Sequence, residues 1–121
     1  MKISEILKKK KLLVSFETFP PNPTADKETY QSIVDAALEL SSLHPDFMSV
    51  TYGAGGGTSS NTADIASRIN NEGGIPALAH LSCISSTKEP IAAGILSLFA
   101  IANCRMRVYN MQKTDKGEEA I

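Results

Sequence analysis

Glu17 is the residue of this sequence whose type and surroundings first suggest chemistry. It lies within the segment VSFETFPP, with Phe16 and Phe19 beside it and two prolines following. Aromatic surroundings disfavour the charged form of a carboxyl group, which is a common way to make a general acid that works near neutral pH. A glutamate at a strand end is also often simply solvated. At this point both interpretations of Glu17 stay open.

Three apolar segments, residues 11–17, 46–52 and 75–81, are the predicted strands that must position such chemistry. Helices are predicted between them, and this alternation is typical of parallel strands joined by right-handed crossovers. Ligand sites in such α/β folds lie at the C-terminal ends of the strands. We therefore expect one shared rim for the polar residues at the strand ends, which are Glu17, Thr51 with Tyr52, and His80.

The predicted helices are read from spacing and capping residues. Apolar residues recur at i, i+3, i+4, i+7 and i+8 over residues 30–38, and Thr24 is the predicted N-cap of that helix. A second helix is predicted over residues 62–72, ended by the two glycines that follow. Residues 86–89 match a capping box that opens a third helix. Near the end, residues 106–110 alternate enough for a fourth strand.

The bulk properties exclude several classes of protein. A chain of 121 residues, 42% of them hydrophobic, suits one globular domain, and the net charge of -1 gives no reason to expect a nucleic-acid partner. No apolar run approaches the roughly 20 residues of a membrane helix, and the start lacks the pattern of a secretory signal. Two cysteines are too few for a disulfide framework, so a cytoplasmic location is expected. His80 and Cys83 lack a second ligand pair, and no metal site is predicted.

Four glycines, at 53, 55, 56 and 57, follow one predicted strand and precede a helix. A dinucleotide-binding turn must be considered, but Thr58 stands where its third glycine or alanine belongs and the acidic residue expected after the next strand is absent. The dinucleotide-binding signal is therefore weak. Glycines also allow the backbone to approach a flat cofactor closely, with amide groups free to bind its polar atoms. A loop without a ligand is the third interpretation, and the residues do not choose between it and the cofactor-contacting loop.

Taken together, the motifs resemble those of the methylenetetrahydrofolate reductase family. SFETFPP, DFMSVTYGAGGGT and AHLSC occur in the family's order and spacing, and the similarity runs from Ser15 to Glu89. The resemblance implies a (β/α)₈ TIM-type barrel that binds FAD. It implies an oxidoreductase that passes hydride from NADH or NADPH through the flavin to methylenetetrahydrofolate, giving methyltetrahydrofolate for one-carbon metabolism and methionine biosynthesis.

The same resemblance assigns roles to individual residues. Glu17 matches the family's general acid, which protonates the folate nitrogen as the bridging methylene opens. Thr51 and His80 match residues of the flavin site. Four further residues are assigned to the flavin site because they lie next to these two in the matched motifs: Tyr52, Gly53, Ala54 and Ser82.

The sequence also departs from the family pattern. Thr18 stands where the family usually has an aromatic residue, and where the family's fourth strand ends in a motif like LALRGD this chain reads ANCRMRVYNMQKTDKG. No residue is carried over there, and residues 104–121 are expected to form a frayed tail. Because such a barrel takes about 250 residues, residues 1–121 are expected to form a single partial domain, the first three to four βα units of an incomplete barrel in a truncated chain.

Two other functions stay open. An incomplete barrel exposes a strand edge, and a second chain could cover it. The alternative is therefore a non-catalytic barrel portion that acts as a binding or interaction domain, with a homo-oligomer among its expected states. A Rossmann-like nucleotide binder, resting on residues 53–57, is the third hypothesis.

Overall fold

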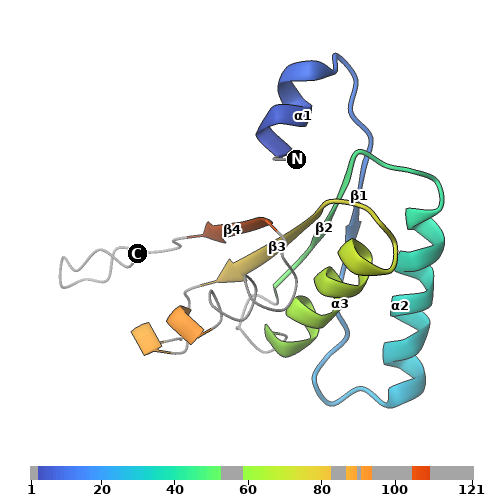
Figure 1. Ribbon diagram of the computed structural model, residues 1–121. Coiled ribbons are helices and arrows are strands. Elements are labelled where there is room, and N and C mark those ends of the chain that lie inside the picture. Colours follow the sequence, from blue (N-terminus) through green and yellow to red (C-terminus); the bar gives the residue numbers. More distant parts are fainter. Residues whose placement is uncertain (1–2, 53–58, 83–86, 90, 94–104, 110–121) are drawn as a thin grey trace.

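The computed structural model describes residues 3–52, 59–82, 87–89, 91–93 and 105–109. Figure 1 shows their arrangement. The elements in chain order are α1 (Ile3–Lys9), β1 (Ser15–Thr18), α2 (Lys27–Ser41), β2 (Phe47–Val50), α3 (Ser59–Asn71), β3 (Ala77–Ser82) and β4 (Arg105–Tyr109).

The four strands form one sheet in the order β1-β2-β3-β4, and every neighbouring pair is parallel. Helices α2 and α3 lie side by side against one face of this sheet (Figure 1). The α/β class and the parallel sheet predicted from the alternation of strands and helices are therefore confirmed. The fourth strand is confirmed as well, at Arg105–Tyr109, inside the stretch expected to be a tail. The remainder of that stretch, residues 110–121, lies outside the described residues.

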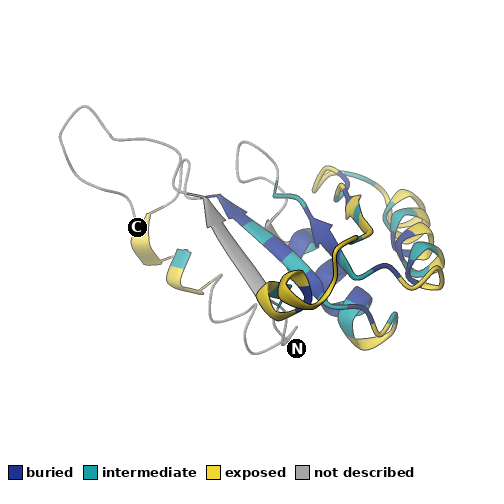
Figure 2. Ribbon diagram, turned by 90° about the horizontal axis from the view of Figure 1, so that it is seen from above, coloured by how far each residue is buried: buried dark blue, intermediate teal, exposed yellow. Residues whose placement is uncertain are grey.

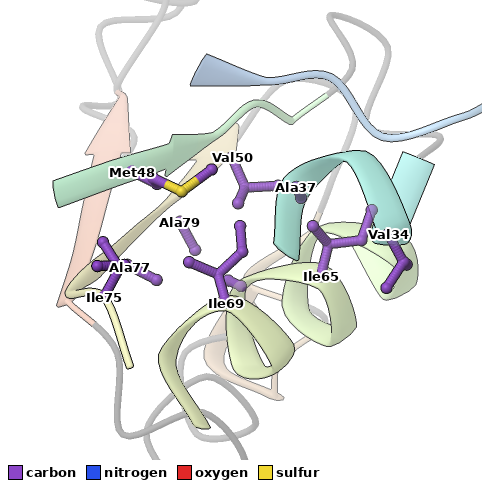
Figure 3. Packing of buried hydrophobic residues seen from close by; sticks show 10 residues of the cluster. Val34, Ala37, Met48, Val50, Ile65, Ile69, Ile75, Ala77 and Ala79 are labelled. Carbon is purple, nitrogen blue, oxygen red and sulfur yellow. The ribbon is translucent and has the colours of Figure 1, made fainter. Parts of the chain in front are cut away.

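The hydrophobic core lies between the sheet and the two helices (Figure 3). Alternate strand residues point to the helices, since successive side chains of a strand lie on opposite faces. Helix α3 contributes the apolar face that its spacing predicted, and α2 contributes its own predicted face in part. The buried apolar residues of the cluster are Val34, Ala37, Met48, Val50, Ile65, Ala66, Ile69, Ile75, Ala77 and Ala79. Figure 2 shows this burial concentrated in the strands and on the inner sides of the helices.

The N-cap predicted for α2 was wrong. Asp26 caps the helix, and its side chain accepts a hydrogen bond from the backbone N–H of Thr29 at 2.7 Å. That hydrogen bond holds the pKa of Asp26 below its usual value. Thr24 belongs instead to the preceding turn, where its N–H and its hydroxyl both donate to the side-chain oxygen of Asn22. Asparagine side chains commonly stabilise such turns in this way, which leaves the next acidic residue as the cap.

The first strand begins later than predicted. Residues 11–14 precede β1, and Leu12 and Val14 are exposed. Asp46 explains this local structure, because its carboxylate accepts hydrogen bonds from the Lys10 ammonium group and from the Val14 N–H. The Lys10 contact holds the pKa of Asp46 below its usual value. A side chain thus takes the Val14 N–H, and the ladder between β1 and β2 begins only at Ser15 and Phe47.

The end of α3 follows the prediction that two glycines terminate it. The helix ends at Asn71, and Gly74 has φ +67°, a left-handed conformation that glycine adopts without strain. For the predicted third helix, residues 88–89 and 91–93 are helical, and its predicted capping residue Ser86 lies outside the described residues. Within the described part of the chain, no helix is long and apolar enough to cross a membrane.

Candidate active site

The strand register brings the polar residues of three strands to one face of the sheet. Met48 and Val50 point to the helices, so the residues that alternate with them lie on the opposite face, here called the distal face. Glu17 on β1 pairs in register with Ser49 on β2. Ser49 in turn pairs with Leu78 on β3. These residues form one level across the distal face.

The next level on this face joins two of the residues assigned by resemblance. Val50 pairs with Ala79. Continuing this register by one residue sets Thr51, the first residue after β2, against His80 of β3. A strand rises about 3.3 Å per residue, which places this level roughly 6.6 Å from that of Glu17 and Ser49. Of the residues predicted for the shared rim, Glu17, Thr51 and His80 thus occupy two adjacent levels of one face, with Glu17 at the deeper level. The register does not extend to Tyr52.

Glu17 is exposed, so of the two interpretations left open for it, the structure favours a solvated carboxyl group over one enclosed by Phe16 and Phe19. Phe16 packs against the core on the helix side of β1, because residues adjacent in a strand point to opposite faces. Phe19 is 66% exposed. The carboxylate instead accepts a hydrogen bond from the hydroxyl of Ser49, with 3.1 Å between Ser49 Oγ and Glu17 Oε1.

The backbone at Thr51 is fixed from two sides. Its N–H donates to the carbonyl of Thr18 at 3.0 Å, which ties the end of β2 to the end of β1. Its carbonyl accepts a hydrogen bond from the hydroxyl of Thr62 in α3 at 2.9 Å, and Thr62 is 1% exposed. Thr51 and Tyr52 are both half-buried. The chain that leaves β2 is thus anchored to both a strand and a helix.

Strand β3 places His80 and Ser82 on the distal face. His80 is half-buried, whereas Ser82 is buried. Their register partners on β4 are Arg107 and Tyr109. These β4 positions were not singled out from the sequence, although the alternation of RMRVY that predicted the strand also places them on one face.

A side-chain hydrogen bond also joins α3 to the proline turn at this end of the sheet. The Asn61 amide of α3 donates to the carbonyl of Pro21, in the proline turn that follows β1, at 3.3 Å. Two of the assigned flavin-site residues, Gly53 and Ala54, lie outside the described residues, as do the other loop glycines and Cys83. Among the described residues, no group of three or more His, Cys, Asp or Glu side chains could hold a metal ion.

Sequence reasoning missed three residues that shape the site: Ser49, Asn61 and Thr62. Ser49 carried a usable pattern, because it alternates with Met48 and Val50 and precedes Thr51 by two residues, so it had to share a face with Thr51. The roles of Asn61 and Thr62 depend on where α3 lies over the sheet. No local pattern in the sequence indicates that.

Comparison with known proteins identifies relatives of this chain. The family profile described as methylenetetrahydrofolate reductase matches residues 2–103. The 5,10-methylenetetrahydrofolate reductase of Pectobacterium carotovorum subsp. carotovorum is 44% identical over 78 residues, which cover 64% of this chain and 25% of that protein. The Escherichia coli (strain K12) enzyme is 41% identical with the same coverage. Arabidopsis thaliana methylenetetrahydrofolate reductase (NADH) 1 is 32% identical over 90 residues, which cover 74% of this chain and 15% of that protein.

The aligned stretch spans about a quarter of the length of these bacterial relatives. The match includes all of β1, β2 and β3 and ends two residues before β4 begins. The strands that bring Glu17, Thr51 and His80 together therefore all lie within the matched stretch. With 102 of its 121 residues inside the profile match, residues 2 to 103, the chain belongs to the methylenetetrahydrofolate reductase family.

Proposed function

We propose that this chain takes part in the reduction of methylenetetrahydrofolate to methyltetrahydrofolate, with hydride taken from NADH or NADPH through bound FAD. Family membership supports the class of reaction. The observation that carries the proposal is the arrangement on the distal face, where Glu17 lies one level below the neighbouring pair Thr51 and His80. This arrangement puts a proton donor next to a surface that could contact a cofactor. Such a site suits a reaction that couples hydride transfer to protonation.

The donor set at the upper level fits a flavin. Thr51 and His80 would hold the ring with a hydroxyl group and an imidazole. Both residues are half-buried, and each follows a residue of the register pair Val50 and Ala79. The hydrogen bonds from Thr62 and to Thr18 keep the Thr51 backbone in place before any cofactor binds. Bound FAD would supply the capacity to accept and then donate a hydride. Tyr52, Gly53, Ala54 and Ser82 remain proposed flavin contacts.

Glu17 would act as the general acid. Its carboxyl group would give a proton to the folate nitrogen as the bond between that nitrogen and the bridging methylene breaks, leaving a reactive iminium for hydride transfer. The residue is exposed, so a substrate can reach it. The aromatic surroundings that β1 does not supply would come from the rings of the flavin and the folate, and such desolvation favours the protonated form of a carboxyl group.

We further propose that residues 1–121 supply the first four strands of a (β/α)₈ barrel. The sequential parallel order β1-β2-β3-β4, with α2 and α3 on one face, supports this proposal. In such a barrel the distal face would be the inner face, and the C-terminal ends of the strands would carry the site.

A flavin titration of the purified 121-residue chain tests the proposed function. FAD fluorescence is followed as protein is added, with native size measured in parallel by sedimentation. Saturable binding by a species of defined size is expected. Failure to bind FAD would contradict the proposal, and a stable oligomer without flavin or turnover would favour an interaction domain instead.

Substitution of Glu17 then tests the acid. Glu17→Gln should bind FAD with the parent affinity and be reduced by NADH or NADPH at the parent rate, yet lose reoxidation by methylenetetrahydrofolate. Glu28→Gln is the matched control, because Glu28 is an exposed glutamate in the first turn of α2. Reoxidation of Glu17→Gln at the parent rate would remove Glu17 from the acid role.

A further inference from the structure

The hydroxyl of Ser49 is placed to orient the Glu17 carboxyl group. The two residues are register partners on neighbouring parallel strands, and Ser49 Oγ lies 3.1 Å from Glu17 Oε1. Their surroundings differ sharply, since Ser49 is 9% exposed and Glu17 is exposed. Ser49 also lies on β2, which is paired on one side with β1 and on the other with β3. A buried donor thus faces an exposed acceptor.

We propose that Ser49 is a positioning residue for Glu17, an inference that rests on the proposed role of Glu17 as the general acid. An exposed glutamate has three rotatable side-chain bonds and spreads over several rotamers, so a free Glu17 would spend little time in a geometry suited to proton transfer. Serine has a single χ angle before its hydroxyl, and Ser49 is buried within the sheet. Its hydrogen bond to Oε1 selects one orientation and leaves Oε2 for the substrate.

The hydroxyl group also suits a residue that changes protonation state. A serine hydroxyl can donate one hydrogen bond and accept others, and it rotates to suit its partner. Ser49 can therefore donate to the Glu17 carboxylate and still contact the carboxyl group once a proton has been taken up. An alanine at this position would remove the contact in both states. A threonine would keep it, because the hydroxyl remains on Cβ.

Rotamer populations of Glu17 provide a test that needs neither cofactor nor turnover. Three-bond couplings between the α and β protons of Glu17 are measured by NMR in the 121-residue chain. The parent and Ser49→Thr should show one dominant χ1 rotamer, and Ser49→Ala should show couplings averaged over several. Ser15→Ala is the control, because Ser15 is an exposed serine two residues before Glu17 on the same strand. Averaged couplings in the parent, or unchanged couplings in Ser49→Ala, would overturn the proposal.

The two half-reactions of the flavin provide the second test. Ser49→Ala should leave flavin reduction by NADH or NADPH unchanged and slow reoxidation by methylenetetrahydrofolate by about threefold to tenfold, the loss expected for one hydrogen bond to the acid. Ser49→Thr should restore reoxidation. Equal slowing of both half-reactions would indicate a merely structural role and would count against the proposal. If the parent chain binds no flavin, the proposed function fails, while the rotamer measurement still decides whether Ser49 orients Glu17.

Discussion

Replacing Gly73 by alanine should lower the free energy of unfolding by about 1–3 kcal/mol, the usual cost of forcing a methyl group into a packed site. A Cβ at this position would lie 2.7 Å from the backbone oxygen of Ile69, 2.7 Å from Ser41 Oγ and 2.9 Å from Ser41 Cβ. The backbone oxygen cannot move without distorting the last turn of α3. Ser41 cannot yield cheaply either, because it is 2% exposed and its hydroxyl donates to the Ala37 carbonyl at 2.9 Å.

Urea unfolding followed by far-UV circular dichroism measures this effect, and the neighbouring glycine supplies the controls. Gly74 has open space around its Cβ position but a φ of +67°. Gly74→Ala should therefore cost about 1–2 kcal/mol through backbone strain alone, and Gly74→Asn should cost less because asparagine tolerates this conformation. The reasoning about packing would be refuted if Gly73→Ala unfolded at the parent midpoint with an unchanged urea dependence.

Three further substitutions test other contacts. Thr18→Val should raise the free energy of unfolding by about 1 kcal/mol, because the buried Thr18 hydroxyl has no hydrogen-bond partner within the described structure; a urea midpoint below the parent's would contradict this. Thr62→Val should cost about 1 kcal/mol and weaken FAD binding, since it releases the Thr51 carbonyl; titration and unfolding together measure both effects. Burial and the Asp64 carboxylate raise the pKa of Tyr30. The folded chain therefore keeps the phenolic proton of Tyr30 at pH values at which the unfolded chain loses it. Stability should therefore fall as pH rises above about 10, and Tyr30→Phe should reduce that fall in a series of urea titrations.

The elements that the sequence predicted well are those whose pattern is local. Helix α3 buries Ile65, Ala66 and Ile69, the face that 3.6-residue spacing selects. The glycine pair at the end of that helix was also recognisable, because few other residues adopt a positive φ. Parallel strands followed from the alternation of strand and helix, since a parallel pair needs a long crossover connection.

The features that escaped prediction depend on contacts distant in sequence. The carboxylate of Asp46 delays the start of β1 from a position 32 residues away from Val14. The sequence left the surroundings of Glu17 open, because residues adjacent in the chain need not be neighbours in space, and it is the register that places Ser49 beside it. Family motifs supplied the residues that we propose for the flavin site. They did not identify the side chains that hold those residues in place.

The contact between Gly73 and Ser41 bears on the candidate active site as well as on stability. Ser41 is the last residue of α2 and leads into β2, while Gly73 follows α3 and leads into β3. Their close approach therefore fixes the relative positions at which the two strands begin, together with the hydrogen bond from the Met48 N–H to the Pro76 carbonyl.

We expect the relative start of β2 and β3 to set their register, which pairs Val50 with Ala79 and directs Thr51 and His80 to neighbouring positions after them. A displaced β3 would separate this pair, so Gly73→Ala should weaken FAD binding at temperatures where the variant is still folded. Gly74→Asn should not weaken it, because its cost is confined to the local backbone. Parent affinity for FAD in folded Gly73→Ala would mean that the strand ladder alone sets the register, and that the packing of the helix ends contributes to stability without shaping the site.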